Sequence, residues 1–151
     1  MKPAQIAFAG KIRAAQASDH ARIAELAGQL GYPSTSEEIA RRLQGMNGSA
    51  DAAVFVAELD SGEIAGWIAV FVYRTVEADA RAEVSGLVVD ERFRSQRVGE
   101  RLLARAEEWA RENGCRAIGL RSNVIRERAH AFYERHGYKH VKTQQAFRKQ
   151  L

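Results

Sequence analysis

Residues 84–103, which read VSGLVVDERFRSQRVGERLL, decide the fold of this chain, because a strand, a basic turn and a helix follow one another within them. Residues 84–89 are almost continuously apolar, as expected of a strand that is covered on both faces. A helix begins with backbone N–H groups that lack internal partners and with the positive end of its dipole. The start of this helix is therefore expected to bind an anion, above all a phosphate. Beyond the turn, apolar residues recur at helical spacing, at Leu102, Leu103, Ala106, Trp109 and Ala110.

The turn itself carries Arg94 and Arg97 and ends on Gly99. It resembles the coenzyme-A-binding motif of the GNAT superfamily of N-acetyltransferases, Arg/Gln-x-x-Gly-x-Gly/Ala between the fourth strand and the third helix. Arg94 takes the first position of that motif and Gly99 the last, but Arg97 stands where a glycine is usual. Glycine lets the backbone approach a pyrophosphate closely and tolerates unusual dihedrals. Arginine keeps the amide donor if its own dihedrals are ordinary, so coenzyme binding is not excluded. Looser or altered coenzyme binding is the open alternative.

A second segment, residues 123–138, carries the same resemblance. It begins with Asn123 at the end of a predicted strand and ends with Gly137, where a helix can stop. The family closes with an asparagine followed by Ala-x-x-Phe-Tyr-x-x-x-Gly-Tyr/Phe. Three residues of the predicted helix match that pattern at the expected order, namely Ala129, Phe132 and Tyr133.

The resemblance implies an enzyme that moves the acetyl group of acetyl-CoA directly onto a primary amine of a small molecule or peptide. Tyr133 matches a tyrosine that often lies near the thioester sulfur, and a phenol of pKa about 10 can protonate the leaving thiolate. Glu83 is the preferred general base, acting through water, and a surface glutamate is the alternative reading. The residues expected to contact the coenzyme are Leu87, Val88, Val89, Arg94, Ser95, Gln96, Arg97, Val98, Gly99, Glu100, Asn123, Ala129 and Phe132.

Alternation along the strand that begins near Glu83 places that residue on the same face as Leu87 and Val89, unless a bulge near Gly86 breaks the register. The family is splayed at this point, which implies that the amides of Leu87 and Val89 are available to the thioester arm. One of them can polarise the acetyl carbonyl.

The remaining pattern predicts one α/β (α+β) domain over residues 11–151, with residues 1–10 as a flexible lead-in. The resemblance implies a mixed central sheet of six to seven strands with helices on both faces, splayed between strands four and five. Ser18 and the pair Ser34 and Glu37 are the expected helix caps. Strands are predicted at residues 11–15, 53–59, 64–73, 82–89, 117–123, 138–142 and 145–149, and the last helix at 126–136.

The acceptor pocket is less well defined by the sequence. Tyr32 lies in a loop that borders the acceptor site in the family. Trp67, Phe71 and Tyr73 alternate on one strand face, where they either line that pocket or belong to the core. Acidic residues would favour a cationic acceptor, and the nearest ones are Glu77, Asp79 and Glu83.

The composition bounds the classes of function. The chain has 151 residues and a net charge of +4, which is mild and does not favour nucleic acid as a partner. One cysteine fits a reducing compartment, so a cytoplasmic protein is expected, without a membrane segment. The histidines lack metal-ligand spacing, so no metal is expected. Three alternatives stay open: a protein or aminoacyl-tRNA amine as acceptor, a non-catalytic acyl-CoA sensor, and a homodimer, which the family allows.

Overall fold

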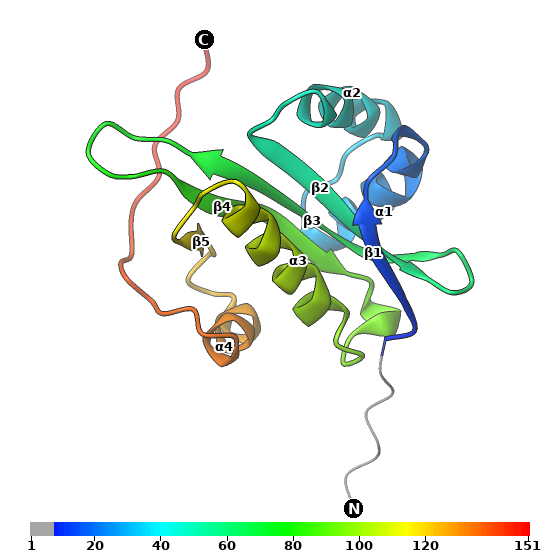
Figure 1. Ribbon diagram of the computed structural model, residues 1–151. Helices are drawn as coiled ribbons and strands as arrows, with labels where there is room; N and C mark the ends of the chain where they lie inside the picture. Colours follow the sequence, from blue (N-terminus) through cyan, green and yellow to red (C-terminus); the bar gives the residue numbers. More distant parts are fainter. Residues whose placement is uncertain (1–7) are drawn as a thin grey trace, which may run out of the picture. The chain divides into compact units, whose positions relative to one another are not determined.

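A five-stranded mixed sheet is the framework of the computed structural model, which describes residues 8–151 (Figure 1). The strands lie in the order β1-β2-β3-β4-β5, and every neighbouring pair is antiparallel except β4 and β5, which are parallel. Their bounds are β1 Gly10–Ala14, β2 Ala52–Leu59, β3 Ile64–Tyr73, β4 Arg81–Val89 and β5 Ile118–Leu120.

The described residues also form four α-helices and two short 3₁₀-helices. The α-helices are α1 (His20–Leu30), α2 (Ser36–Asn47), α3 (Val98–Glu112) and α4 (Glu127–Arg135), and the 3₁₀-helices are η1 (Ala17–Asp19) and η2 (Glu91–Phe93). The chain divides into two compact units, one ending at Leu120 and one comprising Arg121–Leu151. The larger unit contains the whole sheet with α1, α2 and α3, whereas the smaller contains α4 and the segment that follows it.

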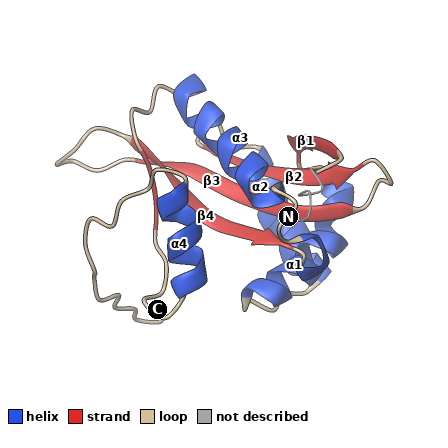
Figure 2. Cartoon of the chain, turned by 90° about the horizontal axis from the view of Figure 1, so that it is seen from below, coloured by secondary structure: helices blue, strands red, loops and turns tan. Residues whose placement is uncertain are grey.

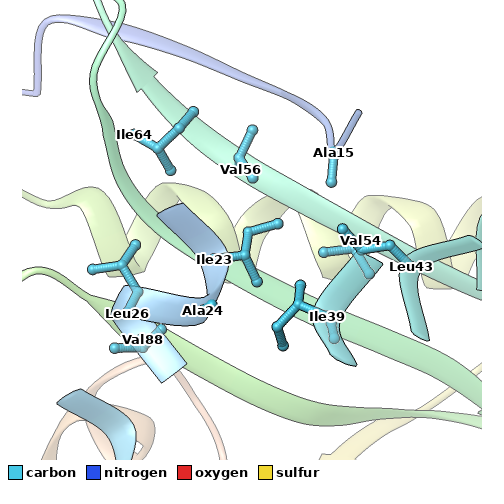
Figure 3. Close-up of a cluster of buried hydrophobic side chains, with 11 residues drawn as sticks. Ala15, Ile23, Ala24, Leu26, Ile39, Leu43, Val54, Val56, Ile64 and Val88 are labelled. Carbon is cyan, nitrogen blue, oxygen red and sulfur yellow. The ribbon is translucent and has the colours of Figure 1, made fainter. Parts of the chain in front are cut away.

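Helices α1 and α2 pack on one face of the sheet, and their side chains mesh with those of β2, β3 and β4 (Figure 3). Helix α3 covers the opposite face, where Leu102 lies so close to Gly66 of β3 that a Cβ at that glycine would come within 3.2 Å of it. The sheet is therefore covered on both faces, as predicted. The cluster on the α1–α2 face comprises Ala15, Ile23, Ala24, Leu26, Ile39, Leu43, Val54, Val56, Ile64, Ala69 and Val88.

Helix α1 and helix α2 begin one or two residues away from the predicted caps. Ser18 lies inside η1, and the carboxylate that caps this start is Asp19, which accepts a hydrogen bond from the Gln16 N–H at 2.7 Å. In α2 the capping box is formed by Thr35 and Glu38 and not by the predicted Ser34 and Glu37. Both pairs have the required spacing of three, so the sequence pattern alone does not distinguish them.

The prediction of a flexible lead-in over residues 1–10 does not hold for its last residues. Residues 1–7 of it lie outside the described residues, whereas Phe8 is buried and Gly10 begins β1. The guanidinium of Arg101 in α3 lies 5.0 Å from the centroid of the Phe8 ring. Gly10 has no room for a side chain, because a Cβ there would lie 2.2 Å from the carbonyl oxygen of Glu58. The fold therefore includes residues 8–10.

The prediction of six to seven strands is wrong for the part of the chain that the structure describes. Residues 117–123 contribute only the three-residue strand β5, and residues 138–142 and 145–149 form no strand. Figure 2 draws everything after α4 as loop. A strand is stabilised by a ladder with a neighbour, and alternation in the sequence does not supply that neighbour. Here most residues after Tyr138 are exposed to solvent.

A bulge in β4 changes which residues share a face. Val84 pairs with Val70 and Gly86 with Ala69, so Ser85 has no direct partner on β3. Because the extra residue reverses the alternation, Glu83 shares the α1–α2 face with Val88, while Leu87 and Val89 point to the α3 face. The uninterrupted alternation that groups Glu83 with Leu87 and Val89 is therefore wrong, and the bulge considered near Gly86 is present.

Candidate active site

The turn between β4 and α3 carries two non-glycine residues with left-handed backbones. Arg94 is extended, with φ −64° and ψ 152°, and its Nε donates a hydrogen bond to the carbonyl oxygen of Val89 at 3.4 Å. Ser95 then has φ 71°, and Arg97 has φ 65° and ψ 18°. A left-handed conformation costs a non-glycine residue about 1–2 kcal/mol. Such residues persist only where the surroundings hold them, and they cluster at functional sites.

Arg97 therefore does not adopt the ordinary dihedrals under which arginine would replace glycine without cost. It keeps the backbone that a glycine would adopt and carries the strain of a side chain in that position. Its guanidinium lies near Glu100, with Nε to Oε2 at 4.0 Å.

Helix α3 begins directly after Arg97 with amides that its N-cap residue does not satisfy. Arg97 makes no side-chain capping hydrogen bond. The helix start is anchored by Val98, whose side chain is 1% exposed and packs into the core. The first amides, at Val98, Gly99 and Glu100, belong to the end of the helix that carries the positive dipole. Such an end can hold a phosphate group.

The edge of β4 that leads to this turn is only partly paired with β5. Their pairing covers three residue pairs and ends at Val84 with Leu120, although β4 continues to Val89. The Asp90 N–H donates to the Ala65 carbonyl at 2.8 Å, so Asp90 and every second residue before it along the end of β4 direct their N–H groups toward β3. Leu87 and Val89 consequently direct their N–H groups away from β3.

Glu83 is buried on the α1–α2 face, being only 7% exposed, so its reading as a surface glutamate is wrong. It pairs across the sheet with Phe71, and the next pair on the same face is Arg81 with Tyr73. The guanidinium of Arg81 lies 4.5 Å from the centroid of the Tyr73 ring, and the rings of Phe71 and Tyr73 are 6.2 Å apart. A carboxylate and a guanidinium thus lie on one aromatic surface.

Two other acceptor candidates differ in their surroundings. Trp67 packs against the hydrophobic cluster and lies over Gly86, where a Cβ would come within 2.8 Å of its ring. It belongs to the core, although its buried Nε1 has no hydrogen-bond partner in the structure. Tyr32, by contrast, is 70% exposed and directly follows Gly31, the left-handed residue that ends α1.

The second signature lies in the smaller unit, where local contacts form the turn before α4 and end the helix. The Asn123 side chain accepts a hydrogen bond from the Ile125 N–H at 3.1 Å. After α4, Gly137 is left-handed, and the Tyr138 N–H donates to the Tyr133 carbonyl at 3.0 Å. The two tyrosine rings lie 5.8 Å apart. This is the Schellman arrangement, including its side-chain contact, so Gly137 ends the helix as predicted.

Tyr133 is half-buried, and burial raises the pKa of its phenol, while the positive charge of Arg126 acts in the opposite direction. Phe132 packs on His136, with ring centroids 4.7 Å apart, and Ala129 is also half-buried. The hydroxyl of Tyr133 therefore stays protonated at neutral pH, as a proton donor must.

Three residues of this region were not predicted from the sequence. Ser85 is the exposed bulge residue in β4, and Arg81 stands beside Glu83. Asp90 is a carboxylate that is only 1% exposed, directly before the turn. Asp90 had one sequence signal that could have identified it, namely a carboxylate at the end of an apolar strand. Ser85 and Arg81 can be recognised only from the register of the sheet.

The fold and the turn define a class of protein, and a family comparison agrees with them. Residues 20–138 match the model of the "Acetyltransferase (GNAT) family". The chain belongs to this family and is an N-acetyltransferase, for which membership implies acetyl-CoA as cosubstrate. The alternative of a non-catalytic acyl-CoA sensor is thereby set aside.

Individual relatives fall within the same class. An aminoglycoside N(6')-acetyltransferase type 1 of Stenotrophomonas maltophilia is 31% identical over 97% of both chains. An aminoalkylphosphonate N-acetyltransferase of Salmonella typhimurium is 40% identical over 82 residues, so the match spans about half of that enzyme, 53% of its length. The crystal structure of a glucosamine-6-phosphate N-acetyltransferase from Arabidopsis thaliana superposes with a TM-score of 0.78 at 26% identity, covering 91% of this chain and 97% of that one.

Two further features of residues 8–151 bear on other classes of site. None of the helices described there is long and apolar enough to cross a membrane. The same residues contain no group of three or more His, Cys, Asp or Glu side chains that could hold a metal ion.

Proposed function

We propose that the turn at residues 94–100 holds the pyrophosphate of acetyl-CoA and that the open edge of β4 at residues 87–89 receives the pantetheine arm. The observation that carries this assignment is the left-handed backbone of Arg97 at the start of α3. It retains the main-chain path of a glycine-containing phosphate turn even though the glycine is absent. The outward N–H groups of Leu87 and Val89 supply donors for the arm and for the carbonyl of the thioester.

Transfer from this position needs two proton movements. The acceptor amine must lose a proton to attack, because ammonium groups of this kind have a pKa of about 10.4. The amine nitrogen then bonds to the acetyl carbon, the carbon–sulfur bond breaks, and the thiolate leaves. We assign removal of the first proton to Glu83 through a water molecule and protonation of the thiolate to Tyr133, whose phenol is restored as the nitrogen of the new amide gives up its second proton.

The acceptor in this proposal is a small primary amine that also carries an anionic group. The α1–α2 face presents Glu83 and Arg81 together, and these two charges suit an amine and an anion on one molecule. Glu77 and Asp79 are exposed in the connection between β3 and β4, so they do not join Glu83 in a buried acidic cluster of the kind that a polycation favours. Two of the three relatives described above are named for amines that bear a phosphonate or phosphate.

The test combines calorimetric titration of the protein with acetyl-CoA and a thiol-release assay over paired amines. Each pair consists of an aminoalkylphosphonate or amino-sugar phosphate and its analogue without the phosphorus group, and an aminoglycoside, a peptide amine and an aminoacyl-tRNA complete the panel. We expect coenzyme binding and faster release with the phosphorus-bearing member of each pair. Preference for the aminoglycoside, or salt-sensitive turnover of the tRNA, would overturn the acceptor assignment.

An Arg81→Ala variant sharpens the acceptor assignment. Loss of the guanidinium should raise KM about tenfold for the anionic amine and leave KM for its uncharged analogue unchanged. Arg74→Ala is the matched control, because Arg74 is a neighbouring exposed arginine whose ion pair, 3.1 Å long, is made with Asp51. Equal effects of the two substitutions would show that Arg81 acts only through the overall charge.

A further inference from the structure

Asp90 is a buried carboxylate for which acetyl transfer has no direct use. It follows the last residue of β4 and is only 1% exposed. Its main chain continues the sheet by one bond, from its N–H to the Ala65 carbonyl at 2.8 Å. Its side chain accepts from the Arg92 N–H at 3.0 Å and from the Arg92 guanidinium at 2.8 Å, and it also accepts from the guanidinium of Arg22.

These contacts connect three elements at the point where the strand ends. Arg22 belongs to α1, and besides Asp90 it donates to the Ile64 carbonyl at the start of β3, at 3.0 Å. Arg92 belongs to η2 and also pairs with Glu63. A second bond joins α1 to η2, from the Glu91 N–H to the Gln29 side chain at 3.1 Å. The exit of β4 is thus fastened to α1 and to β3.

The charges within this network orient its side chains. The hydrogen bonds from Arg92, and after them those from Arg22, hold the pKa of Asp90 well below its usual range against the opposing effect of burial. Asp90 is therefore ionised throughout the neutral range, and both arginines are oriented toward it. Buried ionic groups of this kind contribute more to a defined geometry than to net stability.

The turn that follows needs a fixed starting point. Ser95 and Arg97 both hold left-handed backbones, and each would relax to an ordinary conformation if the turn were free to do so. The far end of the turn is anchored by buried Val98. The near end is anchored by Asp90. Its carboxylate accepts a hydrogen bond from the Arg92 N–H, and its main-chain carbonyl accepts one from the Phe93 N–H at 2.8 Å, so Asp90 caps η2.

We propose that Asp90 is a positioning residue for the coenzyme turn. Through its contacts with Arg22 and Arg92, Asp90 holds the turn in the left-handed path that exposes the first amides of α3. This inference rests on the proposed function, because it takes the turn at residues 94–100 to be the phosphate site. Asp90 acts through the backbone of the turn and does not itself touch the coenzyme.

The test is an Asp90→Asn variant, which keeps the shape and one acceptor but removes the charge between the two arginines. We expect KM and the calorimetric Kd for acetyl-CoA to rise about tenfold, since small displacements of a binding group reduce affinity steeply. The kcat at saturating coenzyme and KM for the amine should stay within a factor of two. Arg92→Gln, at an exposed arginine of the same network, should change the coenzyme KM in the same direction and provides the result if Asp90→Asn does not fold.

Asp19→Asn is the matched control. Asp19 is also a buried aspartate, 8% exposed, that accepts two hydrogen bonds from one arginine, Arg13, at 2.8 and 3.0 Å. It lies in η1, at the start of α1, so its substitution should lower the melting temperature without changing the coenzyme KM. A merely structural role for Asp90 would make the two variants alike, and that outcome would overturn the inference.

A further comparison separates this inference from the proposed function. If Gly99→Glu abolishes coenzyme binding and Asp90→Asn leaves the coenzyme KM unchanged, the phosphate site stands and the role of Asp90 is wrong. If Gly99→Glu has no effect, the phosphate site itself is wrong.

Discussion

The two segments that resemble the family, residues 84–103 and 123–138, are equally clear in the sequence but differ in how the structure supports them. The first runs into α3, six of whose residues are buried, from Val98 to Ala110. The second runs through α4, which has no buried residue. Residues 121–151 contain eight of the 23 Lys and Arg residues but only two of the 19 Asp and Glu residues, a net charge of +6 against −2 for the rest.

This difference teaches that the strength of a motif and the strength of its local packing are separate properties. Strained backbone at Ser95 and Arg97 is maintained by a core on one side and by the Asp90 network on the other. Helix α4 is maintained by the capping hydrogen bonds at its C-terminal end and by contacts among aromatic rings. We expect Gly99→Glu in the first segment to act on coenzyme binding and Tyr133→Phe in the second to act on the chemical step.

The largest expected effect is that of Gly99→Glu in the first segment. A carboxylate at the start of α3 would face the phosphates that the helix end attracts, so acetyl-CoA affinity should fall by at least about 100-fold. Calorimetry measures this directly. Gly45→Glu adds the same charge at an exposed position of α2 where a Cβ meets no atom within 4 Å, and it should leave the affinity unchanged.

Tyr133→Phe, in the second segment, should lower kcat by about 100-fold and leave the Kd of acetyl-CoA unchanged, because it removes a proton donor and no phosphate contact. Steady-state kinetics together with calorimetry separate the two quantities. Tyr138→Phe deletes a hydroxyl from the ring that packs on Tyr133 and serves as control, with kcat expected within a factor of two. A weakened coenzyme complex in Tyr133→Phe would contradict the division between the segments.

The pH dependence of kcat tests the same residue. Burial raises the pKa of Tyr133 above its ordinary value of 10.0, so the phenol remains protonated and active until the pH exceeds that value. The alkaline decline of kcat in the parent enzyme should therefore begin above pH 10 and be absent from Tyr133→Phe. The same raised pKa makes a stability contribution that is complete below the pKa of the unfolded chain and is lost as the pH rises through the folded value.

The smallest expected effect is that of Arg97→Gly. Glycine adopts φ 65° without the cost of about 1–2 kcal/mol, although it also increases the entropy of the unfolded chain. The net gain should raise the melting temperature by about 2 °C, on a scale of roughly 2–4 °C per kcal/mol for a chain of this size. Coenzyme affinity should change by less than about threefold, since the amide donor is retained.

Arg94→Gly is the matched control for strain, because Arg94 lies in the same turn with an ordinary φ of −64°. Glycine relieves no backbone strain at that position and increases the entropy of the unfolded chain, so it should lower the melting temperature. If both substitutions stabilised the protein, relief of charge repulsion and not relief of strain would be the cause.

Much of the architecture was predictable because its signals are local. The apolar run before the turn, the helical spacing after it and the glycines that end the helices depend on residues close together in the chain, and the structure has β4, α3, Gly31 and Gly137 where those signals indicated. The cap of α2 was missed by one residue, since two candidate pairs of equal spacing overlap, and the predicted cap Ser18 lies inside η1, the short helix that precedes α1.

Other features depend on contacts between distant residues. The bulge at Ser85 exists because β3 and β4 must pair on both sides of it, and this reverses the face on which Glu83 lies relative to Leu87. The predicted strands at residues 138–142 and 145–149 have suitable residues but no ladder. Arg22 and Asp90 are 68 positions apart, so their pairing has no local signal.

The amino-acid sequence was sufficient to identify the family, the order of the elements through α4 and the two segments that resemble a coenzyme-binding enzyme, because periodicity, capping and motif spacing are properties of neighbouring residues. The folded chain was needed to show that Arg97 keeps a glycine-like backbone, that Glu83 is buried beside Arg81, and that Asp90 is held between two arginines. Strain, burial and ion pairing arise where separate elements meet, and the free energy that maintains them comes from packing across the sheet.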